Sequence, residues 1–160
     1  KVFGYGRSIW AMIDTESRQP TDILAVRDGL ITSYVEKDYE CPIKKASRVP
    51  INIDTVKFVH TIDTYYNDVD INGHINSVKY IEHVLDLWNL DWYKTYRLKR
   101  FEVAYVAETH QGDKLNFYIE DISDKSVEKE RIFNVLITKT PKNGGKDMEV
   151  VRSNVKFVKD

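Results

Sequence analysis

The chain has a single cysteine, Cys41, among its 160 residues. It can therefore form no disulfide within itself and no zinc site built from several cysteines, and we expect a reducing, cytoplasmic environment. Long apolar runs are missing too, because none approaches the roughly 18 residues that a membrane-spanning helix needs, and we expect no secretory signal. The formal charge of −1 lacks the basic excess that is typical of nucleic-acid-binding proteins.

The composition is that of an ordinary globular protein, with 42% hydrophobic and 31% charged residues. The length suits one well-buried core, or one domain with part of another. The chain starts at Lys1 without an initiator methionine, directly before a strand-like stretch. We therefore expect that a segment is missing at the N-terminus.

The first third of the chain shows little sustained periodicity. Val2–Ile13 is rich in aromatic and β-forming residues, which favours a strand. A short helix is expected over Asp22–Arg27, and the residues from Leu30 onward follow no period for long. This pattern predicts strands at residues 1–20, a linker at residues 21–53 and a separate domain at residues 54–160.

The rest of the chain alternates between clear strand and helix patterns. Thr55–Tyr65 alternates like a strand, and Asn76 is a good N-cap for an amphipathic helix ending near Trp88–Leu90. Four more strand-like runs follow, at Leu98–Val106, Lys114–Ile122, Glu130–Thr138 and Met148–Val158. A strand, a helix and four strands predict an α+β fold, in which a long antiparallel sheet wraps round one central helix and covers its apolar face.

The densest group of functional residue types lies where that helix begins. Asp68, Asp70 and Asn72 occupy positions 1, 3 and 5 of an EF-hand calcium loop. The last position of such a loop needs a bidentate glutamate, but Lys79 stands there. A strand pattern, not a helix, also precedes the loop. The sequence therefore excludes an EF-hand.

Asp70, Asn72 and His74 are spaced by two residues, so in an extended segment their side chains would point the same way. Histidine is well matched to proton transfer near neutral pH, and free N–H groups at a helix start can stabilise an oxyanion. However, Asp, Asn and Gly are also ordinary turn residues. From spacing alone, a turn with a helix cap and a surface histidine remains the better explanation.

The motif DINGHINSVKYI at residues 70–81 closely resembles that of acyl-acyl carrier protein (acyl-ACP) thioesterases, which include plant plastid and bacterial enzymes. The resemblance implies two hotdog domains in tandem. The stretch GRSIWAM at residues 6–12 looks like the closing strand of a truncated first hotdog domain. Residues 54–160 look like a complete second one. The resemblance also implies an acyl carrier protein bearing a fatty acyl thioester as the partner.

Carried over to this sequence, the catalytic residues of the family match Asp70, Asn72, His74 and Glu108. Plant members have a cysteine after the glutamate, where this chain has Thr109, so a covalent cysteine mechanism is not expected. The resemblance implies that a His/Glu pair activates water to release free fatty acid from acyl-ACP in fatty-acid biosynthesis. Two alternatives stay open, an acyl-CoA thioesterase and a non-catalytic domain that binds acyl thioesters. A homodimer is conceivable, and no cofactor is implied.

Other residues give weaker signals. The scattered histidines follow no metal-ligand spacing, so no metal site is expected. Trp88, Trp92 and Tyr93 fit a core better than an acyl pocket. An acidic carrier protein could dock on the basic residues, which are Lys44, Lys45, Arg48, Lys79, Arg97, Lys99 and Arg100.

Overall fold

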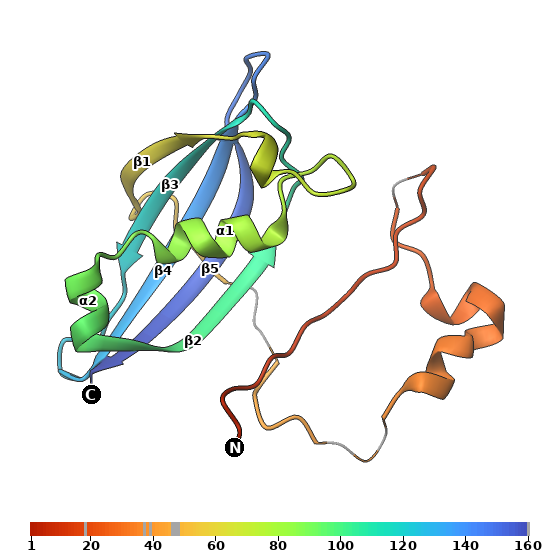
Figure 1. Cartoon of the computed structure of the whole chain (residues 1–160), viewed down its shortest axis with the longest axis horizontal. Coiled ribbons are helices and arrows are strands. Elements are labelled where there is room, and N and C mark those ends of the chain that lie inside the picture. The colour runs from red at the N-terminus through yellow and green to blue at the C-terminus, as the bar shows by residue number, and fades with distance from the viewer. Residues whose placement is uncertain (18, 37, 39, 46–48, 160) are drawn as a thin grey trace. The chain divides into compact units, whose positions relative to one another are not determined.

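The structure is a computed structural model that describes residues 1–17, 19–36, 38, 40–45 and 49–159 (Figure 1). The chain divides into two compact units, Lys1–Ser47 and Arg48–Asp160. Within the described part of the chain, no helix combines the length and the apolar character needed to cross a membrane.

The first unit contains one regular element, the 3₁₀ helix η1 (Ile23–Tyr34), among its described residues. The side chain of Asp22 caps it by accepting a hydrogen bond from the N–H of Leu24. Helical geometry breaks at residues 26–29, where Arg27, Asp28 and Gly29 adopt positive φ angles. A helix is therefore present where one was predicted, over Asp22–Arg27, but the predicted end is wrong. Helical geometry breaks at residue 26 and resumes after residue 29.

The strand predicted over Val2–Ile13 is not formed in this structure. The described part of the first unit has a single isolated bridge, between Ile13 and Pro20. A strand needs a neighbour for its backbone N–H and C=O groups. β-forming side chains predict a strand correctly only where such a neighbour exists, and the described residues of this unit supply none.

The second unit is a five-stranded antiparallel sheet in the order β1-β3-β4-β5-β2. All five predicted strands are confirmed within a few residues: β1 (Lys57–Asp63), β2 (Tyr96–Tyr105), β3 (Lys114–Asp121), β4 (Glu130–Thr140) and β5 (Met148–Lys159). A short 3₁₀ helix, η2 (Tyr66–Asp68), follows β1. The regular alternation of apolar and polar residues accounts for this success, since side chains in a strand point alternately to the two faces of the sheet.

The predicted helix is present but is divided in two. The helix α1 (Ser77–Leu85) starts at the predicted N-cap, where the Asn76 side chain accepts a hydrogen bond from the N–H of Val78. It ends before Trp88, and the side chain of Asn89 then caps a second helix, α2 (Leu90–Thr95). The apolar period runs through this break because Trp88 still faces the core.

The core lies between α1 and one face of the sheet, which α1 crosses in Figure 1. Tyr80 and Val84 point from the helix into this core. Trp88 packs its ring 4.8 Å from that of Phe157, and Trp92 lies 5.5 Å from the same ring. These tryptophans belong to the core packing, as predicted. The sheet contributes alternate buried side chains, Leu115, Phe117, Phe133, Val135, Ile137, Val151, Val155 and Phe157.

Candidate active site

His74 lies on a compact turn between η2 and α1. The backbone N–H of Asp70 donates to the carbonyl of His74 at 2.8 Å, and Gly73 has a φ of 81°. The Asp70 carboxylate accepts from the N–H groups of Asn72 at 2.8 Å and His74 at 3.2 Å. The extended geometry assumed from the spacing of two is therefore wrong. Asp70 acts on the turn itself, as an aspartate that accepts hydrogen bonds from the backbone N–H groups after it.

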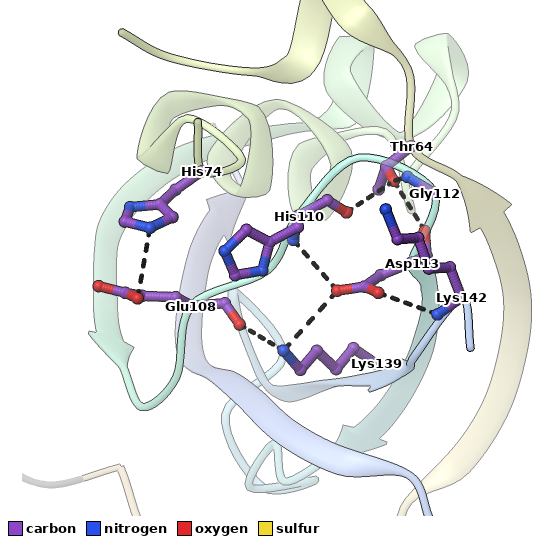
Figure 2. Close-up of polar contacts among 8 residues, drawn as sticks. All are labelled: Thr64, His74, Glu108, His110, Gly112, Asp113, Lys139 and Lys142. Atoms are coloured by element: carbon purple, nitrogen blue, oxygen red, sulfur yellow. Dashed lines mark hydrogen bonds and ion pairs between the residues drawn. The ribbon is translucent and has the colours of Figure 1, made fainter. Parts of the chain in front are cut away.

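A backbone contact brings this turn to the segment that follows β2. The N–H of Ile75 donates to the carbonyl of Thr109 at 2.8 Å, and both residues are buried. Each is next to a predicted catalytic residue, so His74 and Glu108 become neighbours. The Nε2 atom of His74 lies 3.3 Å from the Oε2 atom of Glu108 (Figure 2). Their side chains are 28% and 49% exposed, so a substrate can reach this pair from solvent.

The four predicted site residues thus take different places. His74 and Glu108 meet through their side chains, and Asp70 reaches His74 through the backbone of the turn. Asn72 is exposed, and its backbone N–H donates a hydrogen bond to the Asp70 carboxylate. A pair that can carry a proton is therefore present, together with one residue that shapes the turn.

Thr109 stands where plant members of the resembling family have cysteine. Its side chain is fully buried. A buried hydroxyl cannot approach a substrate carbonyl, so Thr109 is not placed to act as a nucleophile.

His110, one of the histidines for which the sequence predicts no role, lies beside His74. Its ring lies 5.1 Å from that of His74, in an edge-to-face arrangement. The one hint in the sequence is that His110 stands two residues after Glu108. In a strand this spacing would place the two side chains on the same face, but it says nothing about a contact with His74. Among the described residues, no group of three or more histidine, cysteine, aspartate or glutamate side chains could hold a metal ion.

A buried carboxylate, that of Asp113, holds the turn after Glu108. It accepts hydrogen bonds from the N–H groups of His110 at 3.1 Å and Lys142 at 3.0 Å. The ammonium group of Lys139 lies 3.7 Å from its Oδ2 atom (Figure 2). Burial raises the pKa of the Asp113 carboxyl, but the two N–H donors and the Lys139 cation outweigh burial and hold that pKa below its usual value.

The Thr64 hydroxyl connects the end of β1 to the same turn. It donates to the carbonyl of Asp113 at 2.8 Å and accepts from the N–H of Gly112 at 2.8 Å. Thr64 is itself buried. The segment that carries Glu108 is therefore tied to the sheet by side chains from three different places in the sequence.

We predict that Asp113→Asn destabilises the protein at pH 7 by about 1–3 kcal/mol, because it removes a charge that the buried donors stabilise. The pKa of Asp113 is lower in the folded than in the unfolded protein. The unfolded state therefore binds more protons as the pH falls below the usual aspartate pKa of about 3.9, and this contribution to stability is lost there. Urea unfolding of the wild type and of Asp113→Asn should show a difference in the free energy of unfolding at pH 7, and this difference should become smaller below about pH 4.

Asp63→Asn is the matched control, since Asp63 is 58% exposed and faces Lys114 at 3.7 Å. It should change the free energy of unfolding by less than about 0.5 kcal/mol at either pH. If the loss in the free energy of unfolding caused by Asp113→Asn stays constant from pH 7 to pH 3, the role assigned to the charge of Asp113 is wrong.

Comparison with known proteins supports a common origin with one family. A family model described as the acyl-ACP thioesterase C-terminal domain matches residues 51–158. The solved acyl-ACP thioesterase from Bacteroides thetaiotaomicron is 41% identical, with a TM-score of 0.72 over 91% of this chain and 52% of that one. No curated protein sequence matches the chain.

More distant structures share the fold. The 12:0-ACP thioesterase from Umbellularia californica is 21% identical, with a TM-score of 0.67 over 92% of this chain and 52% of that one. The 4-hydroxybenzoyl CoA thioesterase from a Pseudomonas species is 12% identical, with a TM-score of 0.55 over 66% and 84%. The predicted α+β hotdog fold is confirmed. The chain spans about half the length of the two ACP thioesterases.

The family model covers most of the chain, and the identity to the Bacteroides enzyme extends over nearly all of it. The resemblance of the motif at residues 70–81 is thereby confirmed. The chain belongs to the acyl-ACP thioesterase family.

Proposed function

We propose that this protein hydrolyses the thioester of acyl-ACP and releases free fatty acid in fatty-acid biosynthesis. The observation that carries the proposal is the 3.3 Å contact between His74 Nε2 and Glu108 Oε2, both of which lie within the residues matched by the family model. A histidine that is hydrogen-bonded to a carboxylate is held in one orientation and can accept a proton near neutral pH. Family membership favours a thioester over other substrates for this pair.

In the proposed reaction, a water molecule loses a proton to the His74–Glu108 pair as its oxygen attacks the thioester carbonyl. The tetrahedral oxyanion then collapses, the C–S bond breaks, and the pair returns the proton to the leaving thiolate. Either side chain can serve as the general base. Asp70 keeps His74 in place through its backbone N–H. Asn72 was carried over as a fourth catalytic residue, and from its exposed position we propose that it contacts substrate.

The start of α1 supplies the proposed oxyanion donors, because N–H groups there are free of helical partners and carry a positive dipole end. The N–H of Val78 is already donated to the Asn76 side chain. Among the described residues, none accepts from the N–H of Ser77, whose own carbonyl accepts from the Tyr105 hydroxyl at 3.1 Å. Ser77 is therefore the donor we propose.

The carrier is proposed to be acyl carrier protein, the substrate that the names of the Bacteroides and Umbellularia relatives state for those proteins. The docking residues predicted from the sequence are partly engaged within the chain. Lys79 pairs with Glu82 at 2.9 Å, and Arg100 pairs with Glu102. Lys99 is exposed, while Arg48 lies outside the described residues. We retain Lys99 as the main candidate for carrier contact.

We also propose that residues 54–160 form the second of two tandem hotdog domains, with a linker at residues 21–53 and the end of the first domain at residues 1–20. The match of the C-terminal family model to residues 51–158 supports this arrangement, as does the 52% coverage of the longer relative. The division of the chain after Ser47 falls within the proposed linker. A cytoplasmic location and a homodimer stay predictions.

The proposal is tested by thiol release from acyl-ACP and from acyl-CoA of the same chain length, using the complete protein. We expect kcat/KM to be larger for acyl-ACP by on the order of tenfold or more, because carrier contacts add to binding. Comparable rates on the two carriers, or faster release from acyl-CoA, would assign the alternative acyl-CoA activity. If neither thioester is hydrolysed, the proposed function is refuted, and a non-catalytic domain that binds acyl thioesters is the remaining alternative.

A further inference from the structure

A lysine occupies a place on β4 where the sequence pattern requires an apolar residue. Val135 and Ile137 are fully buried on the face of the sheet that α1 covers. Alternation puts the next residue on this face at Lys139, which is opposite Leu115 on β3. The side chain of Lys139 is only 13% exposed. Withdrawing an ammonium group even partly from water is unfavourable unless the group is paired and hydrogen-bonded, so the partners of Lys139 indicate why it is there.

Lys139 has two partners on the segment after β2, and both bear on the candidate site. Its Nζ atom donates to the backbone carbonyl of Glu108 at 2.6 Å and lies 3.7 Å from the buried carboxylate of Asp113 (Figure 2). Asp113 is itself fixed by two backbone N–H groups. The lysine therefore joins the main chain of Glu108 to an anchored charge.

We propose that Lys139 is a positioning residue for hydrolysis: by holding the Glu108 carbonyl, it keeps the Glu108 carboxylate against His74. The inference rests on the proposed function of the His74–Glu108 pair. Glu108 lies outside any strand, between β2 and β3, where the sheet ladder does not constrain it. Backbone hydrogen bonds hold both neighbours, Ala107 to the carbonyl of Val150 at 3.4 Å and Thr109 to the N–H of Ile75 at 2.8 Å. The charged contact of Lys139 holds the carbonyl of Glu108 itself. A loss of position at a catalytic group lowers the rate steeply, since catalysis depends on near-ideal geometry.

The test is a double-mutant cycle in the complete protein, with hydrolysis of acyl-ACP as the measurement. Lys139→Met should lower kcat by about 10- to 100-fold and leave KM within about twofold, because Lys139 does not touch substrate. Lys139→Arg, which keeps a charged donor, should recover much of the rate. In a Glu108→Gln background, Lys139→Met should cause no further loss, since a residue that acts only through Glu108 has nothing left to position.

Lys114→Met is the matched control, because this lysine on β3 is 59% exposed and meets Asp63 at 3.7 Å. It should leave kcat unchanged. Thermal unfolding of each variant separates lost folding from lost positioning, and assays are made below the melting temperature. If Lys139→Met does not fold, Lys139→Ala takes its place in the cycle, since it also removes the donor to the Glu108 carbonyl.

The outcomes separate the two proposals. If Glu108→Gln is inactive but Lys139→Met keeps the wild-type kcat, Lys139 is not a positioning residue and the proposed function stands. If Lys139→Met lowers kcat by the same factor in the wild-type and in the Glu108→Gln background, Lys139 does not act through Glu108 and contributes to fold stability alone. If Glu108→Gln keeps the wild-type rate, the His74–Glu108 assignment itself is wrong.

Discussion

Replacing Glu108 by glutamine should lower kcat for thioester hydrolysis by about 10²- to 10⁴-fold, the usual range for loss of a general acid–base partner. Glutamine keeps the size and the hydrogen-bonding oxygen but cannot take up a proton or carry a negative charge beside His74. The carboxylate lies 3.3 Å from the imidazole and is half exposed, so the substitution should not disturb packing. Steady-state rates of thiol release from acyl-ACP measure the effect.

His74→Gln should reduce kcat over a similar range, and the double variant should lose little more than either single one, because the two groups act as a unit. Glu82→Gln is the control, since this glutamate on α1 is 52% exposed and pairs with Lys79 on the same helix, away from the His74–Glu108 contact. Its kcat should match that of the wild type. Near-wild-type hydrolysis by either His74→Gln or Glu108→Gln would refute the assignment of the His74–Glu108 pair.

Phe157→Ala should lower the free energy of unfolding by about 3–5 kcal/mol, a large part of the stability of a domain this size. Phe157 is fully buried on β5. Its ring contacts those of Trp88 at 4.8 Å and Trp92 at 5.5 Å, so truncation would leave a cavity under both helices. Urea unfolding at pH 7, followed by tryptophan fluorescence, measures the loss.

Phe58→Ala on β1 provides the comparison, because this phenylalanine is 58% exposed and touches mainly the ring of Tyr118 at 5.6 Å. Its truncation should cost less than about 1.5 kcal/mol, the worth of an aromatic pair. Losses of equal size at the two positions would show that the core does not lie between α1 and the sheet.

Local patterns in the sequence were sufficient for most elements of the second unit. Apolar residues at every second position of Lys114–Asp121 and Glu130–Thr140 predict strands because these residues line the core under α1, and residues 133–137 are buried on both faces of the sheet. Asn76 predicts the start of α1 because its side chain satisfies an N–H group that no helical carbonyl can reach. These features depend on neighbours within a few residues, which a sequence shows directly.

Predictions failed where the conformation depends on a distant or missing neighbour. The aromatic stretch Val2–Ile13 predicts a strand, but a strand cannot form from side-chain preference alone. The spacing of Asp70, Asn72 and His74 assumed extended backbone, whereas the aspartate folds the chain into a turn through its own hydrogen bonds. The motif at residues 70–81 identified the segment that contains His74. The conformation of that segment is set by hydrogen bonds from backbone N–H groups to Asp70.

By itself, the sequence determined the α+β class, the strands, the helix start and the residues with which the family resemblance is made. Only the tertiary structure decided which of those residues meet. The Ile75–Thr109 hydrogen bond sets His74 beside Glu108, and Lys139, which pairs with the buried Asp113, donates a hydrogen bond to the backbone carbonyl of the glutamate. Such contacts join segments far apart in the chain, so no local period encodes them. The lone sign in the sequence was a lysine that interrupts the apolar alternation of β4.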